Sequence, residues 1–262
     1  MKKQLSALLA MATILSYSTN LASAAPISLS LTMTTNSGMD ITIVSGSQGS
    51  GVGSFDLIGT IDITLDDALY VDDWSPANDT TSINFDDAAV AVSDETLVVG
   101  TSGTIAIFSG VGINTLISAN PMLLTQDPGG PPFTYSFDPG AGGPTAMSLD
   151  EGTIDIAGFG QLIPLDLALA PVNFDIPPNA TTALLTQDVS QVGSTVTVDV
   201  ILSIPLSFSS TATTDFGGVD LSLSGAFVAT GSYTHVVPEP STLVLLGIAA
   251  VGLVPLWRRM RK

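Results

Sequence analysis

The chain has 262 residues, no cysteine and a formal net charge of −18. All six of its lysines and arginines lie at the two ends, at Lys2, Lys3, Arg258, Arg259, Arg261 and Lys262. Residues 4–257 therefore contain no permanent cation. A segment without lysine or arginine has no side chain that could neutralise the phosphate groups of nucleic acid. These facts exclude nucleic acid as a partner.

The N-terminus has the features of an export signal. Two lysines precede an apolar stretch over residues 5–15, and small residues follow at positions 22–24. About eleven apolar residues are too few to cross a hydrocarbon layer of ~30 Å. We predict that residues 1–24 are a signal peptide, recognised by the export machinery and cleaved by signal peptidase after Ala24. Residues 25–237 are then an acidic extracytoplasmic domain.

Apolar and polar residues alternate through this domain with a period of two. In the clearest case, seven apolar residues from Val196 to Phe208 alternate with Thr, Asp, Ser and Pro, and shorter examples occur at 27–34, 55–66, 104–108, 153–159 and 219–227. This period is typical of half-buried strands, and the scarcity of Lys, Arg and Glu disfavours helices. We predict an all-β fold, either an antiparallel β-sandwich or a strongly curved β-roll.

Residues 120–144 interrupt the alternation with six prolines and several glycines. Such composition is typical of a loop or linker. The segment lies near the middle of the domain, so two alternatives remain: one large β-domain, or two smaller β-domains divided at residues 120–144.

The C-terminus reads VPEPSTLVLLGIAAVGLVPLWRRMRK. Its residues 241–257 are largely apolar and would be about 25 Å long as a helix, which is short but sufficient for one membrane span. The four basic residues Arg258, Arg259, Arg261 and Lys262 follow, and such residues stay on the cytoplasmic side of a membrane. We predict a transmembrane helix at about 241–257 that holds the acidic domain outside the cell membrane.

The triplet Pro238-Glu239-Pro240, followed by the apolar run and the basic cluster, resembles the PEP-CTERM sorting signal of exported bacterial proteins. The resemblance implies that an exosortase, a membrane enzyme, processes residues 238–262. A membrane-anchored precursor would then become a cell-surface or extracellular protein. Such tails accompany exopolysaccharide production in biofilm-forming Gram-negative bacteria, so extracellular polysaccharide is an implied partner. The alternative is an ordinary membrane anchor in which Pro-Glu-Pro is a stiff spacer.

The domain offers little for catalysis. Its only histidine, His235, lies close to the Pro-Glu-Pro triplet, and the lack of Lys, Arg and Cys removes the amine, guanidinium and thiolate that many enzymes use. A pair of carboxylates could hydrolyse a glycoside, but among 23 acidic residues some pair meets the required spacing by chance. We expect the protein not to be an enzyme.

Calcium is the strongest cofactor candidate, because it binds six to eight oxygen ligands. Acidic residues are dense between positions 56 and 95, and the candidate ligands are Asp62, Asp66, Asp67, Asp72 and Asp73. No EF-hand spacing or glycine-rich calcium repeat occurs, however. The alternative is a solvated acidic face that keeps the protein soluble, and no metal site or cofactor is assigned.

An export and sorting signal, a soluble acidic β-domain and no evident catalysis together predict a structural or interaction protein of the cell surface or extracellular matrix. The alternative function is a calcium- or glycan-binding β-module on the cell surface.

Overall fold

The computed structural model describes residues 26–45, 49–66, 82–99, 104–127, 133–158, 161–193, 195–214 and 217–236. All regular structure within these residues is β, which confirms the predicted all-β class. The strands are β1 (Ile27–Met33), β2 (Gly38–Ser45), β3 (Gly49–Leu65), β4 (Ser82–Val92), β5 (Glu95–Val99), β6 (Thr104–Ile113), β7 (Thr115–Ser118), β8 (Met122–Leu123), β9 (Thr125–Gln126), β10 (Thr134–Phe137), β11 (Thr145–Leu149), β12 (Glu151–Gly158), β13 (Gln161–Asp166), β14 (Val172–Ile176), β15 (Ala183–Val192), β16 (Thr195–Thr214) and β17 (Gly217–Val236).

The alternation in the sequence determines which side chains face the core. In β16 every second residue from Val196 to Leu206 is buried, and in β3 Phe55, Leu57, Ile61, Ile63 and Leu65 are buried in the same way. The residues between them are mostly Ser, Thr and Asp and face outward. The sheet therefore separates an apolar inner face from a polar outer face.

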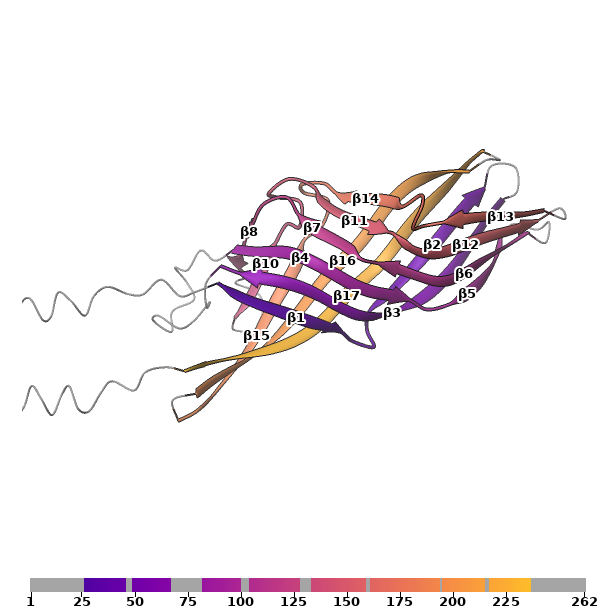
Figure 1. Cartoon of the computed structure of the whole chain (residues 1–262). Helices are drawn as coiled ribbons and strands as arrows, with labels where there is room; N and C mark the ends of the chain where they lie inside the picture. The colour runs from indigo at the N-terminus through magenta and orange to yellow at the C-terminus, as the bar shows by residue number, and fades with distance from the viewer. Residues whose placement is uncertain are drawn as a thin grey trace, which may run out of the picture.

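Fourteen of the described strands form one antiparallel sheet in the order β13-β12-β6-β4-β3-β1-β17-β16-β15-β10-β9. In addition, β2 lies between β3 and β17, β5 pairs with β6, and β8 pairs with β4. The longest pairing joins β16 to β17 from Thr195↔Val236 to Thr214↔Gly217. This hairpin runs the length of the molecule (Figure 1).

The remaining strands form a second sheet in the order β14-β11-β7, which covers the inner face of the first. Its strand β7 lies beside β4, and its strand β14 lies beside β16. In the large sheet, the three strands β3, β1 and β17 lie between β4 and β16. The three strands of the small sheet also reach from β4 to β16, on the other side of the core. The large sheet is therefore strongly curved, and the apolar core lies between the two layers (Figure 1). The architecture combines features of the two predicted forms, a curved sheet and a second sheet packed on it.

A side chain joins the two sheets where their backbones do not pair. The Ser118 hydroxyl in β7 accepts a hydrogen bond from the backbone N–H of Phe85 at 3.0 Å and donates one to Asn84 Oδ1 at 2.6 Å. Ser118 is buried, so these bonds satisfy a polar group that would otherwise be costly to bury.

At the other end of the molecule β5 crosses the inner face of β2 and β3. The approach is so close that a Cβ added at Gly53 would lie 1.8 Å from Leu97 Cδ2. The rings of Phe55 and Phe108 meet beside this crossing, with centroids 4.7 Å apart. A larger residue at position 53 would therefore require the Leu97 side chain to shift.

The interpretation of residues 120–144 as loop or linker was wrong in part. The segment contains β8, β9 and β10, and β10 pairs with β15 from Thr134↔Thr186 to Phe137↔Ala183. The prolines and glycines lie on either side of the tetrapeptide 134–137, which carries no breaker and completes the edge of the sheet. Strands from both sides of the segment pair with each other, as β12 does with β6 and β17 with β1 and β2.

Candidate functional site

The chain leaves the body through β17, whose middle part is paired on both sides. Strand β16 pairs with all of β17, while β2 pairs with residues 220–226 and β1 with residues 229–230 on the other side. Among the described strands, only β16 pairs with residues 231–236. The last pair is Thr195↔Val236, two residues before Pro238. His235 lies in this last stretch, opposite Val196.

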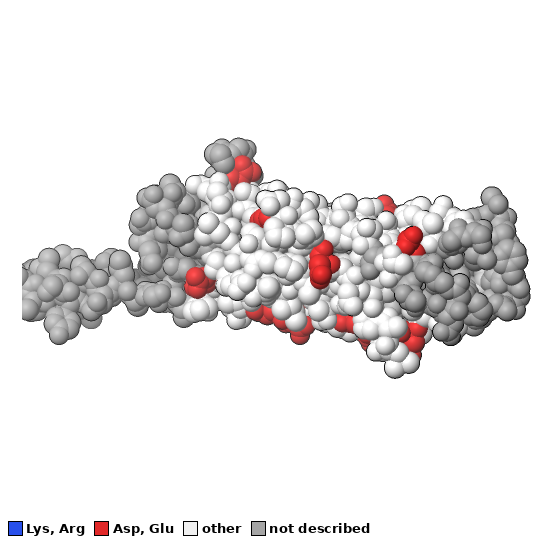
Figure 2. Space-filling view, turned by 90° about the horizontal axis from the view of Figure 1, so that it is seen from above, with Lys and Arg blue, Asp and Glu red and all other residues white. Residues whose placement is uncertain are grey.

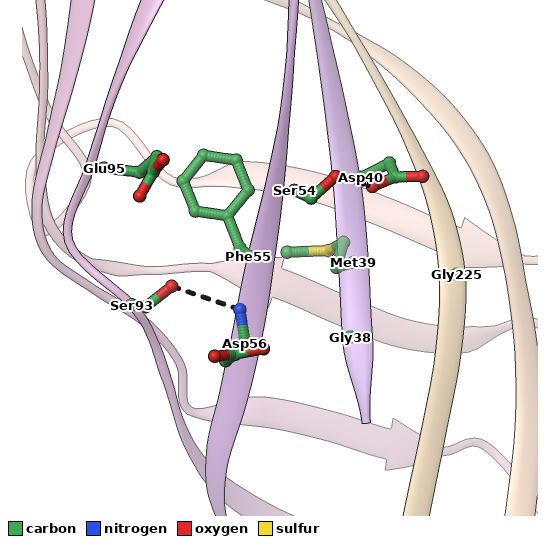
Figure 3. Close-up of a pocket in the computed structure, with 9 residues that line it drawn as sticks. All are labelled: Gly38, Met39, Asp40, Ser54, Phe55, Asp56, Ser93, Glu95 and Gly225. Carbon is green, nitrogen blue, oxygen red and sulfur yellow. Dashed lines mark hydrogen bonds between the residues drawn. The ribbon is translucent and has the colours of Figure 1, made fainter. Parts of the chain in front are cut away.

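A shallow acidic cavity of about 410 Å³ lies where β2, β3 and β5 meet (Figure 3). The carboxylates of Asp40, Asp56 and Glu95 line it, and the Ser54 hydroxyl donates a hydrogen bond to Asp40 Oδ1 at 2.5 Å. The Ser93 hydroxyl accepts a hydrogen bond from the backbone N–H of Asp56 at 3.1 Å. The cavity thus presents mainly acceptors, which suit hydroxyl or cationic ligands. Sequence reasoning missed it, because only the register of β2 with β3 brings Asp40 opposite Ser54.

Several carboxylates of the described residues accept hydrogen bonds from backbone N–H groups or from side-chain hydroxyls and amides. Asp150 accepts hydrogen bonds from the backbone N–H of Asn114 and the hydroxyl of Thr115, at 2.8 and 2.7 Å. Asp94 accepts one from the backbone N–H of Gly110 at 2.8 Å. In Figure 2 the acidic side chains occupy several separate places on the visible face, some of them in a row along its lower edge, and do not form one patch. These carboxylates therefore stabilise turns and strand ends.

Residues 236–262 match the family described as the PEP-CTERM protein-sorting motif. The chain carries a PEP-CTERM sorting motif. The match confirms the resemblance drawn from Pro-Glu-Pro, the apolar run and the basic cluster, and it begins at the residue on which β17 ends. No curated protein and no solved structure matches the chain.

The PEP-CTERM motif implies an exported protein with a membrane-anchored precursor and an exosortase as its processing partner. Its residues Pro238, Glu239 and Pro240, the basic residues Arg258, Arg259, Arg261 and Lys262, and the predicted span at 241–257 lie outside the described residues. The predicted signal peptide, 1–24, lies outside them as well. Within the described part of the chain, no helix is long and apolar enough to cross a bilayer.

The structure describes two of the five candidate calcium ligands. Asp62 is exposed on β3 opposite Asp87 of β4, and Asp66 follows the end of β3, where its backbone N–H bonds to the carbonyl of Ser82 at 3.0 Å. The candidates Asp67, Asp72 and Asp73 lie in 67–81, outside the described residues. In the described ranges, no three His, Cys, Asp or Glu side chains are grouped so that they could hold a metal ion. The five residues stay candidate calcium ligands, with a solvated acidic face as the alternative.

Proposed function

We propose that this exported protein is a structural or interaction component of the cell surface or extracellular matrix, and that its body has no catalytic role. The observation that carries the proposal is the PEP-CTERM motif at residues 236–262, attached directly to a sheet-rich acidic body. A sorting motif specifies where a protein is placed, and the function of the body follows from its surface.

The surface supports a role in a hydrated matrix. The body from residue 25 to 237 has 23 carboxylates and no lysine or arginine, so its formal charge is −23. Such a charge keeps copies apart at low ionic strength and lets cations or neutral polymers bring them together when it is screened. Extracellular polysaccharide is the partner that fits this behaviour, and a biofilm of a Gram-negative bacterium is the setting that such a tail favours.

A calcium- or glycan-binding β-module is the second candidate, and two pairs of aspartates at opposite register positions in the sheet favour calcium. Asp62 faces Asp87 across β3 and β4, and Asp188 faces Asp199 across β15 and β16. Like charges directly opposite each other destabilise a sheet, and a divalent cation would relieve the repulsion. Calcium would then raise the melting temperature more than sodium does at equal ionic strength.

The main proposal is tested by following the mass and location of the protein in cells with and without the sorting enzyme. With the enzyme present, we expect the tail to be lost near Pro240 and the body to reach the cell surface or the medium. Without it, the full-length precursor should stay in the membrane fraction. The variant Glu239→Ala should accumulate as precursor, and Glu151→Ala, at an exposed carboxylate of β12, is its matched control. Equal masses and locations in both strains would refute the proposal.

A further inference from the structure

The sorting motif and the folded body share a boundary with almost no spare chain. Strand β17 stays paired to Val236, the residue at which the PEP-CTERM match begins. Four residues, 237–240, separate the last paired residue from the start of the apolar run at Ser241. Fully extended, they span about 13 Å at ~3.3 Å per residue. The enzyme that processes the tail is implied to be a membrane enzyme, so it and the body must both approach this short segment.

Folded strands lie directly beside this segment. Two layers of strands surround the core, and stacked sheets lie ~10 Å apart before side chains are counted. Strands β15 and β16 continue beside β17, as far as Val192 and Thr195 at its last residue (Figure 1). While β17 is paired, the ends of β15, β16 and β17 lie together at Val236. The two residues from Val236 to Pro238 span at most about 7 Å of extended chain.

Within the described part of the chain, the C-terminal end of β17 pairs with a strand on one side only. Residues 220–226 also pair with β2 and residues 229–230 also pair with β1, but residues 231–236 pair with β16 alone among the described strands. Ser232 and Thr234 are exposed, and Tyr233 is the partly buried residue that packs this end against the core. Strand ends held by one partner open at low free energy compared with the whole domain. Separation of these six residues from β16 would add about 20 Å of extended chain.

We propose that the folded body controls its own processing: the sorting enzyme acts on the PEP-CTERM tail after residues 231–236 of β17 separate from β16. The pairing of Thr195–Val200 with Gly231–Val236 then sets the rate at which the precursor is processed. This inference rests on the proposed sorting of the chain by an exosortase.

A cross-strand disulfide can lock this pairing, because the register identifies suitable positions. Pro205 has no N–H, yet it lies opposite Ala226 in an unbroken ladder, so that pair is a non-hydrogen-bonded one. Pairs alternate along the ladder, and Thr197↔Thr234 and Ser207↔Ser224 belong to the same class. Their Cα atoms lie about 4.5 Å apart in ideal geometry, within the range that a disulfide accepts. The chain has no cysteine of its own, so each double variant can form one intramolecular disulfide.

The test compares Thr197→Cys/Thr234→Cys with the matched control Ser207→Cys/Ser224→Cys, which lies on the same hairpin far from the tail. Both are made in the full chain, and the conversion of precursor to processed protein is followed in cells after a pulse of synthesis. We expect the disulfide at 197–234 to slow processing about tenfold or more, because opening of the strand end then requires a broken covalent bond. Reductant in the medium should restore the rate, while the control disulfide and the single-cysteine variants should process at the wild-type rate.

A second variant keeps the test independent of disulfide yield. Six Gly and Ser residues inserted between Val236 and Val237 replace the chain that strand opening would supply, so they should restore processing in the locked variant. Processing of the locked protein at the wild-type rate, or failure of the insertion to restore it, would overturn the inference. If even the wild-type chain is never processed, the proposed function fails instead, and the two failures are thus distinguishable.

Discussion

At the scale of single residues, Gln187 conflicts most clearly with its surroundings. It lies in β15 with 2% of its surface exposed, and its backbone N–H donates to the carbonyl of Phe133 at 3.0 Å. Neither Nε2 nor Oε1 of its side chain has a hydrogen-bond partner within the described protein. A buried polar group without a partner costs about 1–3 kcal/mol, so this side chain destabilises the sheet.

Replacement of this amide by an apolar side chain of similar size should stabilise the protein. We expect Gln187→Met to raise the free energy of unfolding by about 1–3 kcal/mol, because it removes two desolvated polar atoms and keeps the volume. Urea unfolding of the purified mature protein measures the change. Gln191→Met is the control on the same strand, where the exposed amide donates to the Gly193 carbonyl at 3.0 Å, and its effect should stay within ~0.5 kcal/mol. Equal or lower stability of Gln187→Met would mean that the amide is satisfied.

At the scale of elements, the two layers depend on small residues where strands cross. Strand β5 packs on β2 and β3 through Leu97 and Val99, both buried, and the glycines at 51 and 53 leave the space for it. A Cβ at Gly51 would lie 2.5 Å from the carbonyl oxygen of Val98, and one at Gly53 would overlap the Leu97 side chain. The alternation of apolar and polar residues predicts that these segments are strands. Their close crossing depends on glycine at positions 51 and 53, where a side chain would fill the space that β5 occupies.

The crossing can be tested with a double-mutant cycle. Gly53→Ala should lower the free energy of unfolding by about 1–3 kcal/mol, since the new methyl group overlaps Leu97. Leu97→Ala alone should cost about 2–5 kcal/mol through the cavity that it leaves. In the double variant the cavity accepts the methyl group, so the cost should be smaller than the sum by at least ~0.5 kcal/mol. If the losses in unfolding free energy of the two single variants add up exactly in the double variant, Leu97 of β5 does not pack against position 53.

At the scale of the whole molecule, charge is the dominant property. The mature body carries a formal charge of −23, and several of its described carboxylates, such as Asp94 and Asp150, accept hydrogen bonds from N–H and O–H donors. Repulsion among them acts over ~8 to 10 Å at ordinary ionic strength and destabilises the compact state. The single-domain or two-domain organisation of residues 25–237 stays a prediction, although pairing between early and late strands joins them in one sheet.

Salt should therefore stabilise this protein. We expect the melting temperature of the mature protein to rise between about 0.01 and 0.3 M NaCl, as the Debye length falls from ~30 Å to below 10 Å. Calcium chloride at matched ionic strength provides the comparison. An equal rise with both salts means screening alone, whereas a larger rise with calcium supports the calcium-binding candidate. A melting temperature that falls with salt would contradict the repulsion on which this prediction depends.

Much of this protein was predictable from its sequence because the relevant signals are local. The PEP-CTERM motif is contiguous, the confinement of cations to the ends is a property of composition, and a period of two shows which residues of 196–208 face inward. These properties need no knowledge of which strands are neighbours, since burial on one face follows from backbone geometry alone.

Only the tertiary structure decided which strands meet. The pairing of β10 with β15, the small sheet over the curved one, the cavity between Asp40 and Glu95 and the isolation of Gln187 each depend on contacts between distant residues. The short distance along the chain between the folded body and the sorting motif is of the same kind, because it depends on how far β16 stays paired with β17. Alternating sequences fit many strand orders equally well, and the choice among them is made by close packing of complementary side chains over the whole core.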